Sequence, residues 1–381
     1  MVLAFALLAA GCGDDGESSS TTTTAGGGGG GEGPIWVLLP DTATSDRWEK
    51  DDRPGFKAAF EAQDLVEGED FNILNAEGDP EVQISQAEQA IADGASVIVL
   101  TSNDSGSGAT IIDMAKEADV AVVEYDRINT EGSQGGDVYV SFDNVKVGAT
   151  MAEVLEPEID ALPVDVPQVV MLNGGEEDNN AFLFRDGYAE TVEARVAAGD
   201  WALVEDTFVP GWDNAEALSI FEQILVGAQN NVNAVFAAND GLASSVIAAL
   251  ESAGLDPTTI PVSGQDATQA GIQNVLLGKQ AMSVYKPIKL ETEIAVQLAL
   301  ALRAGEDPTS VTGDFEIIGI SVEDGSVSDS PTGEGVIPYI ALTPIGVVAD
   351  NVNDTVIADG FRTVEELCTG EVPAAAPEVC G

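Results

Sequence analysis

The chain has 381 residues, of which 44% are apolar, and this is enough for two domains of ordinary size with buried cores. Asp and Glu number 66 against 14 Lys and Arg, which gives a formal charge of −52. Such a charge is typical of a solvated surface in salty surroundings, or of a protein that stores cations. It excludes binding to a nucleic-acid backbone, which needs a basic surface. With no His and three scattered Cys, the sequence excludes imidazole-based catalysis, His-ligated zinc and a thiolate cluster, so no metal or cofactor is expected.

The N-terminus is predicted to be a targeting signal rather than part of the folded protein. Residues 1–11 form an apolar run too short to span a bilayer, and the run ends in Leu8-Ala9-Ala10-Gly11-Cys12, which resembles the lipobox of bacterial lipoproteins. We therefore expect residues 1–12 to be a lipoprotein signal peptide and Cys12 to be lipidated, although the basic start of a signal peptide is missing. Residues 13–33, rich in Gly, Ser and Thr, are predicted to be a disordered linker.

From Pro34 onward, short apolar runs alternate with stretches of helical periodicity. In the first unit we predict strands at 35–39, 71–74, 97–100 and 120–124, and helices at 53–63, 82–93 and 109–118. The order then restarts, with strands at 168–172, 201–208, 232–237 and 260–263, and helices at 181–198, 215–228 and 244–253. Later elements are a strand at 279–285, a helix at 290–303, an irregular stretch at 305–335 and a strand at 336–342. Such alternation predicts two similar α/β domains with parallel sheets covered by helices.

Polar residues follow corresponding strands of the two units. The third strand leads into Asn103-Asp104 in the first unit and into Asn239-Asp240 in the second. The fourth strand leads into Asp126-Arg127 and, in the second unit, into Gln265-Asp266. Because ligands of open parallel sheets bind beyond the carboxyl ends of the strands, we expect these two edges to face one cleft.

The polar residues at these positions are of the types that recognise sugars. Carboxylates and guanidinium groups bridge neighbouring hydroxyls, amides both donate and accept, and indole rings pack on the C–H face of a sugar ring. The candidate set is Asp41, Arg47, Trp48, Asp126, Arg127, Asp143, Asn144, Asn179, Asn180, Trp212, Asn239, Asp240, Gln265, Asp266 and Lys286. Trp48 and Trp212, in polar loop-like settings, are expected to stack on a ligand, whereas Trp36 and Trp201, in predicted strands, are expected in the core.

Several of these residues have alternative interpretations. Asp or Asn after a strand often caps the next helix. Lys286 precedes Pro287 between the predicted domains, so a hinge role competes with sugar contact. Two carboxylates could also serve as the acid and base of a glycosidase, but the acids are dispersed over both units and no pair stands out.

A series of short segments in one order resembles the periplasmic-binding-protein-like sugar receptors of ABC importers, and within them the xylose-binding proteins. The resemblance covers residues 35–361. Its segments are 46–51 (DRWEKD), 124–127 (EYDR), 140–148 (VSFDNVKVG), 178–181 (DNNA), 211–212 (GW), 238–240 (AND), 263–267 (SGQDA), 284–287 (VYKP), 342–344 (LTP) and 354–361 (DTVIADGF).

The resemblance implies a periplasmic binding protein type I fold, in which two Rossmann-like domains are joined by a three-segment hinge and close on a sugar. The chain is expected to cross between domains near Asp143, Lys286 and Val336. The implied lobes are 34–143 plus 286–335, and 144–285 plus 336–365, followed by a tail at 366–381. In that tail Cys368 and Cys380 are interpreted as a disulfide that closes a short loop, with two free thiols as the alternative.

The resemblance also implies a set of sugar contacts, with the two Trp enclosing the ring. The implied ligand-binding residues are Arg47, Trp48, Asp126, Arg127, Asn144, Asn179, Trp212, Asn239, Asp240, Asp266 and Lys286. The expected function is capture of a monosaccharide, most of all D-xylose, by a monomeric, lipid-anchored, non-enzymatic receptor outside the cytoplasmic membrane, which delivers the sugar to an ABC permease. A sensor that signals to a membrane receptor and a carboxylate-based glycosidase are the alternatives.

Overall fold

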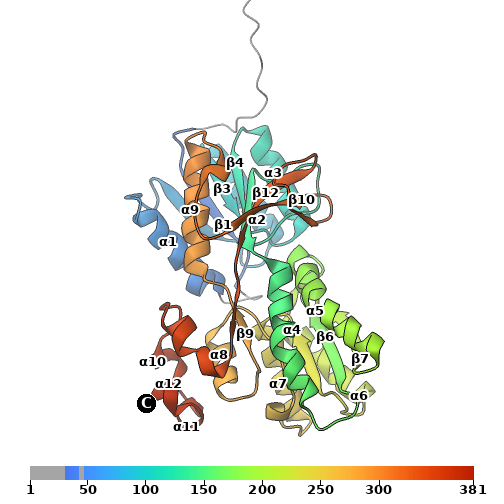
Figure 1. Ribbon diagram of the computed structural model, residues 1–381. Helices are drawn as coiled ribbons and strands as arrows, with labels where there is room; N and C mark the ends of the chain where they lie inside the picture. The colour runs from blue at the N-terminus through green and yellow to red at the C-terminus, as the bar shows by residue number, and fades with distance from the viewer. Residues whose placement is uncertain (1–30, 43–46) are drawn as a thin grey trace, which may run out of the picture.

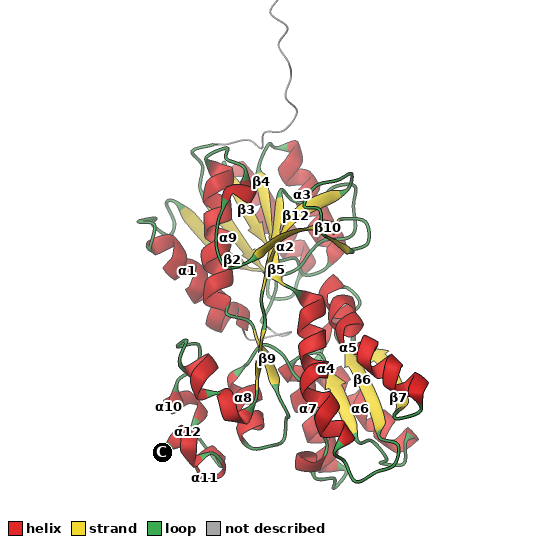
Figure 2. Cartoon of the chain, in the orientation of Figure 1, coloured by secondary structure: helices red, strands yellow, loops and turns green. Residues whose placement is uncertain are grey.

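The structure is a computed structural model that describes residues 31–42 and 47–381 (Figure 1). Cys12, the predicted signal peptide and residues 13–30 of the predicted linker therefore lie outside the described residues. The described chain forms two α/β lobes, which lie one above the other in Figures 1 and 2. Within these residues no helix is both long enough and apolar enough to cross a membrane.

The first lobe is built on a mainly parallel sheet with the strand order β11-β10-β12-β5-β4-β3-β1-β2. Its strands are β1 (Ile35–Leu39), β2 (Phe71–Asn75), β3 (Val97–Leu100), β4 (Ala121–Tyr125), β5 (Val138–Phe142), β10 (Glu316–Ser321), β11 (Val327–Ser328) and β12 (Val336–Leu342). The predicted strands from β1 to β4 are confirmed to within one residue. The stretch 305–335, predicted to be irregular, contains β10 and β11, which form an antiparallel edge of this sheet.

Helices cover both faces of the first sheet, as the alternation along β1 shows. Ile35, Val37 and Leu39 pack with α1 and α9 in one core, while Trp36 and Leu38 pack with α2 and α3 in a second core. Successive side chains of a strand point to opposite faces, so a continuous apolar run fits a sheet that is buried on both sides. The helices are α1 (Arg53–Glu61), α2 (Pro80–Ala92), α3 (Ser105–Glu117) and α9 (Ile288–Arg303), with a short π-helix, η1 (Trp48–Asp52), before α1.

The second lobe has a parallel sheet of order β7-β6-β8 and a small antiparallel pair, β13-β9. Its strands are β6 (Gln168–Asn173), β7 (Ala202–Phe208), β8 (Ala234–Ala237), β9 (Ser283–Tyr285) and β13 (Ile345–Val347). Its helices are α4 (Asn144–Asp160), α5 (Asn179–Ala198), η2 (Pro210–Trp212), α6 (Asn214–Gly227), α7 (Asp240–Ser252), η3 (Pro257–Thr259) and α8 (Gln269–Leu276). The strand predicted at 260–263 is reduced to one bridge, between Val262 and Val235.

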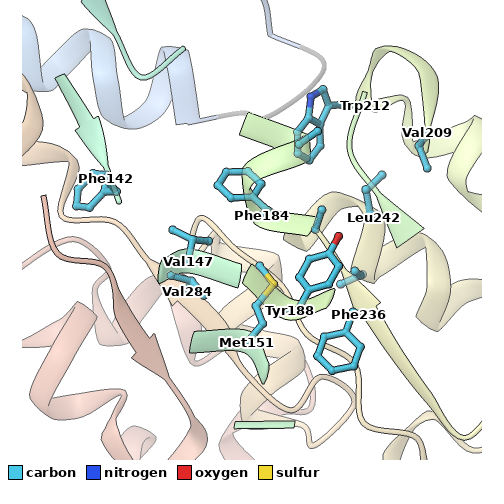
Figure 3. Packing of buried hydrophobic residues seen from close by; sticks show 14 of the residues in the cluster. Phe142, Val147, Met151, Phe184, Tyr188, Val209, Trp212, Phe236, Leu242 and Val284 are labelled. Atoms are coloured by element: carbon cyan, nitrogen blue, oxygen red, sulfur yellow. The ribbon is translucent and has the colours of Figure 1, made fainter. Parts of the chain in front are cut away.

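The core of the second lobe joins its helices to the sheet (Figure 3). Tyr188 of α5 stacks on Phe236 of β8, with ring centroids 5.4 Å apart. Met151 of α4 packs in the same cluster. Trp201, 2% exposed, is buried in this core, as is Trp36 in the first lobe, and both predictions of a core position are confirmed.

The described chain passes between the lobes at three places. After β5 it enters α4 at Asp143, and after β9 it enters α9 through Lys286 and Pro287, as predicted. The third crossing, expected at Val336, lies instead after Leu342. The reason is that β12 pairs in parallel with β5 and therefore belongs to the first lobe throughout its length. The chain enters the second lobe where β13 pairs with β9.

The chain after β13, including the predicted tail at 366–381, forms short helices on the second lobe, beside α8 (Figure 1). They are η5 (Ala349–Asn351), η6 (Asn353–Ile357), α10 (Val364–Leu367), α11 (Val372–Ala375) and α12 (Pro377–Cys380). Leu367 and Val372 are buried in a cluster with Ile272 of α8. Cys368 and Cys380 are joined by a disulfide, with Cα atoms 5.6 Å apart.

Candidate functional site

A small cavity lies where the two lobes meet, at the carboxyl ends of their strands. Its lining residues are Arg47, Trp48, Asp126, Arg127, Asp178, Asn180, Phe184, Trp212, Asn239, Gln265, Asp266 and Lys286. The cleft between two strand edges that the sequence predicts therefore exists as a cavity.

Three of the predicted ligand contacts do not line this cavity. Asn144 donates from Nδ2 to the Oδ1 of Asn180, 2.8 Å away, so it orients a lining residue from behind. Asn179 opens α5 but faces the turn at Gly325 in the first lobe, where an added Cβ would lie 2.2 Å from its Nδ2. The third, Asp240, is buried below the cavity floor.

Asp240 has the contacts of a structural anchor. Its Oδ1 accepts hydrogen bonds from Gln280 Nε2 and Ser283 Oγ, each 2.8 Å away. Its Oδ2 accepts from the backbone N–H of Thr268 at 2.8 Å and from the Thr268 hydroxyl at 3.1 Å. These bonds tie the start of α7 to β9 and to the start of α8. The neighbouring residue Asn239 faces the cavity and also caps α7.

Four lining residues were not among the predicted ligand contacts. Asn180 and Gln265 were in the wider candidate set, and Asp178 stands in one of the family-like segments. Phe184 was missed altogether. It lies four residues after Asn180 on α5, a spacing that places both side chains on one face of the helix and that could have found it.

A buried network of charges crosses the cavity from one lobe to the other. The Arg47 guanidinium donates to both carboxylate oxygens of Asp52, at 2.9 and 2.8 Å, and its Nη1 lies 2.8 Å from Oδ2 of Asp126. The Lys286 ammonium lies 3.3 Å from Asp126 and 3.4 Å from Asp266 of the second lobe. Burial by itself would raise the pKa of Asp126, but Arg47 and Lys286 together hold this pKa below its ordinary value. Asp126 is therefore a carboxylate, able to accept hydrogen bonds from hydroxyls.

The guanidinium of Arg47 is fixed from behind by acids of the first lobe. Asp52 also accepts a 2.7 Å hydrogen bond from the Tyr125 hydroxyl. Glu291 of α9 lies 3.3 Å from Nη2 of Arg47, and burial, with Asp126 nearby, raises the pKa of Glu291 well above its ordinary value. The position of Arg47 is thus set by the protein itself, an arrangement that pre-organises it for a ligand.

Three lining residues have a backbone conformation that residues other than glycine rarely adopt. The φ angles of Asp126, Trp212 and Asp266 are 61°, 53° and 91°. The carbonyl of Asp126 is held by hydrogen bonds from Asn180 Nδ2 at 2.8 Å and from the Tyr139 hydroxyl at 2.8 Å. Strained residues that cluster around one cavity and are held by neighbouring groups are typical of binding sites.

Aromatic side chains from both lobes line the cavity. Trp48 of the first lobe is 2% exposed, and the guanidinium carbon of Arg47 lies 4.3 Å from its ring centroid. Trp212 of the second lobe is 4% exposed and stands edge-on to Phe184, with centroids 6.3 Å apart (Figure 3).

Leaving aside Asp266, whose carboxylate is ion-paired with Lys286, two buried polar atoms of lining residues have no hydrogen-bond partner within the described part of the chain. They are the indole Nε1 of Trp212 and the Oε1 of Gln265. Buried polar groups are nearly always hydrogen-bonded, so a donor and an acceptor that line a cavity indicate a polar ligand. Among residues 31–42 and 47–381, no group of three or more His, Cys, Asp or Glu is placed to hold a metal ion.

Comparison with known proteins agrees with this architecture. A family model described as "Periplasmic binding protein domain" matches residues 36–307. The D-xylose-binding periplasmic protein of Escherichia coli is 34% identical over 329 residues, which cover 86% of this chain and 90% of that protein. Its namesake from Haemophilus influenzae is 34% identical over 333 residues, covering 87% and 91%.

The fold is also found among solved structures. A carbohydrate transporter solute binding protein from Chloroflexus aurantiacus, in complex with D-glucose, superposes with a TM-score of 0.73 at 24% identity, covering 87% of this chain and 97% of that one. The two lobes, their three connections and the match over most of the chain establish that this protein belongs to the periplasmic binding protein family and has its type I fold.

Proposed function

We propose that this protein is an extracytoplasmic receptor that captures a neutral monosaccharide, D-xylose, between its lobes and delivers it to an ABC importer. The observation that carries the proposal is the composition of the cavity, whose lining combines fixed charged and amide groups with one indole from each lobe. The D-xylose-binding names of two relatives at 34% identity support the choice of sugar.

The charges of the cavity favour a neutral ligand. Its lining holds three cations, Arg47, Arg127 and Lys286, and three acids, Asp126, Asp178 and Asp266, so that the formal charges cancel. A sugar acid would bring an unpaired charge into this buried network, which is costly. A neutral sugar instead offers hydroxyls, each of which can donate to a carboxylate and accept from a cation.

The two buried polar atoms without a hydrogen-bond partner among the described residues also fit a neutral sugar. The Trp212 Nε1 can donate to a hydroxyl and the Gln265 Oε1 can accept from one, while the indole faces pack on C–H groups of the ring. Because both atoms are buried, a sugar that lacks the matching hydroxyl leaves them unpaired, and this makes the site selective.

The protonation and contacts of the acids that line the cavity favour sugar binding over glycoside hydrolysis. A glycosidase needs one protonated carboxylic acid beside the bond that it cleaves. Asp126 lies against two cations that lower its pKa, and the carboxylate of Asp178 is engaged by Arg127 at 3.1 Å and by the N–H of Asn180 at 2.9 Å. Asp126 therefore serves better as a hydrogen-bond acceptor than as a proton donor, and Asp178, although burial raises its pKa, already has its carboxylate engaged by Arg127 and Asn180.

The cellular setting is part of the proposal. Lipidation at Cys12 would tether the receptor to the outer face of the cytoplasmic membrane, through residues 13–33. Export of a Cys12→Ser variant into the medium would support the anchor. Neighbouring genes for a permease and an ATPase would support import, whereas a gene for a membrane kinase would support the alternative role in sensing.

Titration calorimetry with a panel of sugars tests the function. We expect saturable binding with D-xylose the tightest among D-xylose, L-arabinose, D-ribose, D-glucose and D-galactose, and no binding of D-glucuronate, the anionic control. Failure of every monosaccharide to bind would overturn the proposed function. Tighter binding of another neutral sugar would overturn the choice of xylose and leave the receptor role standing.

A further inference from the structure

We propose that Arg362 and Asp51 form a clamp between the two lobes, outside the sugar cavity, which slows the release of bound sugar. The proposal rests on the proposed function, because such a clamp matters to a ligand that is enclosed between the lobes. Asp51 belongs to η1 in the first lobe, and Arg362 follows η6 in the second lobe, 311 residues later in the chain.

The contact has the geometry of a strong ion pair. Nη1 of Arg362 lies 2.8 Å from Oδ1 of Asp51, and Nη2 lies 2.9 Å from Oδ2. Each side chain is 9% exposed. A bidentate pair that is shielded from water is screened little by salt and is directional, so it holds two surfaces in one relative orientation.

Both ends of the clamp lie next to residues that line the cavity. Asp51 shares the short helix η1 with Trp48, which lines the cavity. Arg362 donates from Nε to the carbonyl of Ala267, 2.9 Å away, and Ala267 directly follows Asp266. The clamp therefore fixes two segments, one from each lobe, that present a cavity residue, although neither Arg362 nor Asp51 lines the cavity itself.

The second lobe holds Arg362 in place before the lobes meet. Its backbone N–H bonds to the carbonyl of Val356, and its guanidinium carbon lies 3.9 Å from the ring centroid of Phe361. The Phe361 ring packs in turn on Tyr285, with centroids 4.8 Å apart. Because the guanidinium is pre-positioned, pairing with Asp51 requires little further ordering of the side chain. The free energy of the ion pair therefore stabilises the closed arrangement of the lobes.

The variant Asp51→Asn tests the clamp, because it keeps the shape of the side chain and removes its charge. In the full-length protein we expect the dissociation rate of D-xylose, followed by stopped-flow tryptophan fluorescence, and the Kd to rise together, on the order of tenfold. The association rate should change little. The ratio of affinities for D-xylose and D-glucose should stay constant, because no cavity contact is altered.

Two further variants separate a clamp from a general structural effect. Glu49→Gln removes an ion pair from the same η1 helix, to Arg53 at 2.8 Å, within one lobe, and should leave both rates unchanged. Arg362→Lys keeps the charge but loses the planar fork, so its dissociation rate should lie between those of the wild type and Asp51→Asn.

Each outcome bears on one proposal. If the wild type binds sugar and Asp51→Asn releases it at the wild-type rate, or with an altered ratio of affinities, the clamp is overturned while the receptor function stands. If the wild type binds no sugar, the proposed function fails. The clamp is then tested by small-angle scattering, in which Asp51→Asn should have a larger radius of gyration than Glu49→Gln. Equal radii of gyration would overturn the clamp.

Discussion

Arg127 and Asp178 belong to different lobes and meet at the wall of the cavity, with Nε of the arginine 3.1 Å from Oδ2 of the aspartate. Both side chains are more than nine-tenths buried. Nη1 of Arg127 also donates to the carbonyl of Ser102 at 3.1 Å, so the guanidinium is anchored in the first lobe while it reaches the second. The pair thus contributes to the wall of the site and to contact between the lobes.

We expect Arg127→Ala to weaken monosaccharide binding by about 2–4 kcal/mol, because truncating one partner of a buried charged pair leaves the other without its counter-charge. Calorimetry measures the loss directly. The matched control is Arg185→Ala, which removes a partly exposed ion pair with Asp206 in the second lobe, outside the cavity lining, and should leave affinity unchanged. Unchanged affinity in Arg127→Ala itself would place Arg127 outside the binding site.

Trp212→Phe separates the two expected roles of the indole. The variant keeps an aromatic face for the sugar ring but removes the Nε1 donor, which is buried and without a partner among the described residues. Loss of one hydrogen bond to a sugar hydroxyl should weaken binding by about 1 kcal/mol, and Trp212→Ala should weaken it further by removing the ring.

The control for this pair of variants is Trp201→Phe. Its Nε1 donates to Asp160 at 3.0 Å, away from the cavity, so its sugar affinity should match that of the wild type. Equal affinities for the wild type and Trp212→Phe would mean that the indole nitrogen contacts no hydroxyl.

Asp240→Ala should destabilise the fold without weakening sugar binding. The substitution leaves donors from Gln280, Ser283 and Thr268 without their acceptor in a buried place, which should cost about 2 kcal/mol or more at pH 7.5. Urea unfolding measures this loss, and calorimetry on the folded variant should give a wild-type Kd. A strongly weakened affinity would restore Asp240 to the binding site that the sequence predicts.

Asn239 and Asp240 show which features of this site are predictable from the sequence and which are not. The apolar run of β8 and the polar pair after it predict a strand end that faces a ligand, and this part is correct for Asn239. Which of two adjacent side chains faces the cavity depends on where α7 begins and on β9, which lies some 40 residues later and turns Ser283 toward Asp240. Contacts between segments so far apart in the chain leave no periodic pattern in the local sequence, so the sequence does not predict them.

The third crossing illustrates the same limit at the level of the fold. The residues of β12 are as apolar as a strand of either lobe, so composition cannot assign them to one. Their place is decided by pairing with β5, where Tyr339 lies opposite Tyr139, 200 residues earlier in the chain. The early strands are predictable, by contrast, because burial on both faces makes each one a continuous apolar run between helical segments.

Asp240 also predicts a pH dependence of stability. Burial raises the pKa of Asp240 to about 7, although hydrogen bonds from Gln280 and Ser283 act in the opposite direction. An exposed Asp in the unfolded chain has a pKa near 3.9. Between about pH 4 and pH 7 the native state therefore holds a proton that the unfolded state has released, and the free energy of unfolding falls as the pH rises through this range, by as much as about 4 kcal/mol, and levels off above it.

Urea unfolding of the wild type and of Asp240→Ala between pH 4.5 and 8.5, at constant ionic strength, isolates this contribution from the titration of the other acids. The difference in unfolding free energy between the two proteins should be largest at the acidic end and should shrink until about pH 7. It should then stay constant, because Asp240 is ionised in both states above its native pKa. A difference that does not vary with pH would mean that the hydrogen-bond donors around Asp240 outweigh its burial and keep it a carboxylate throughout.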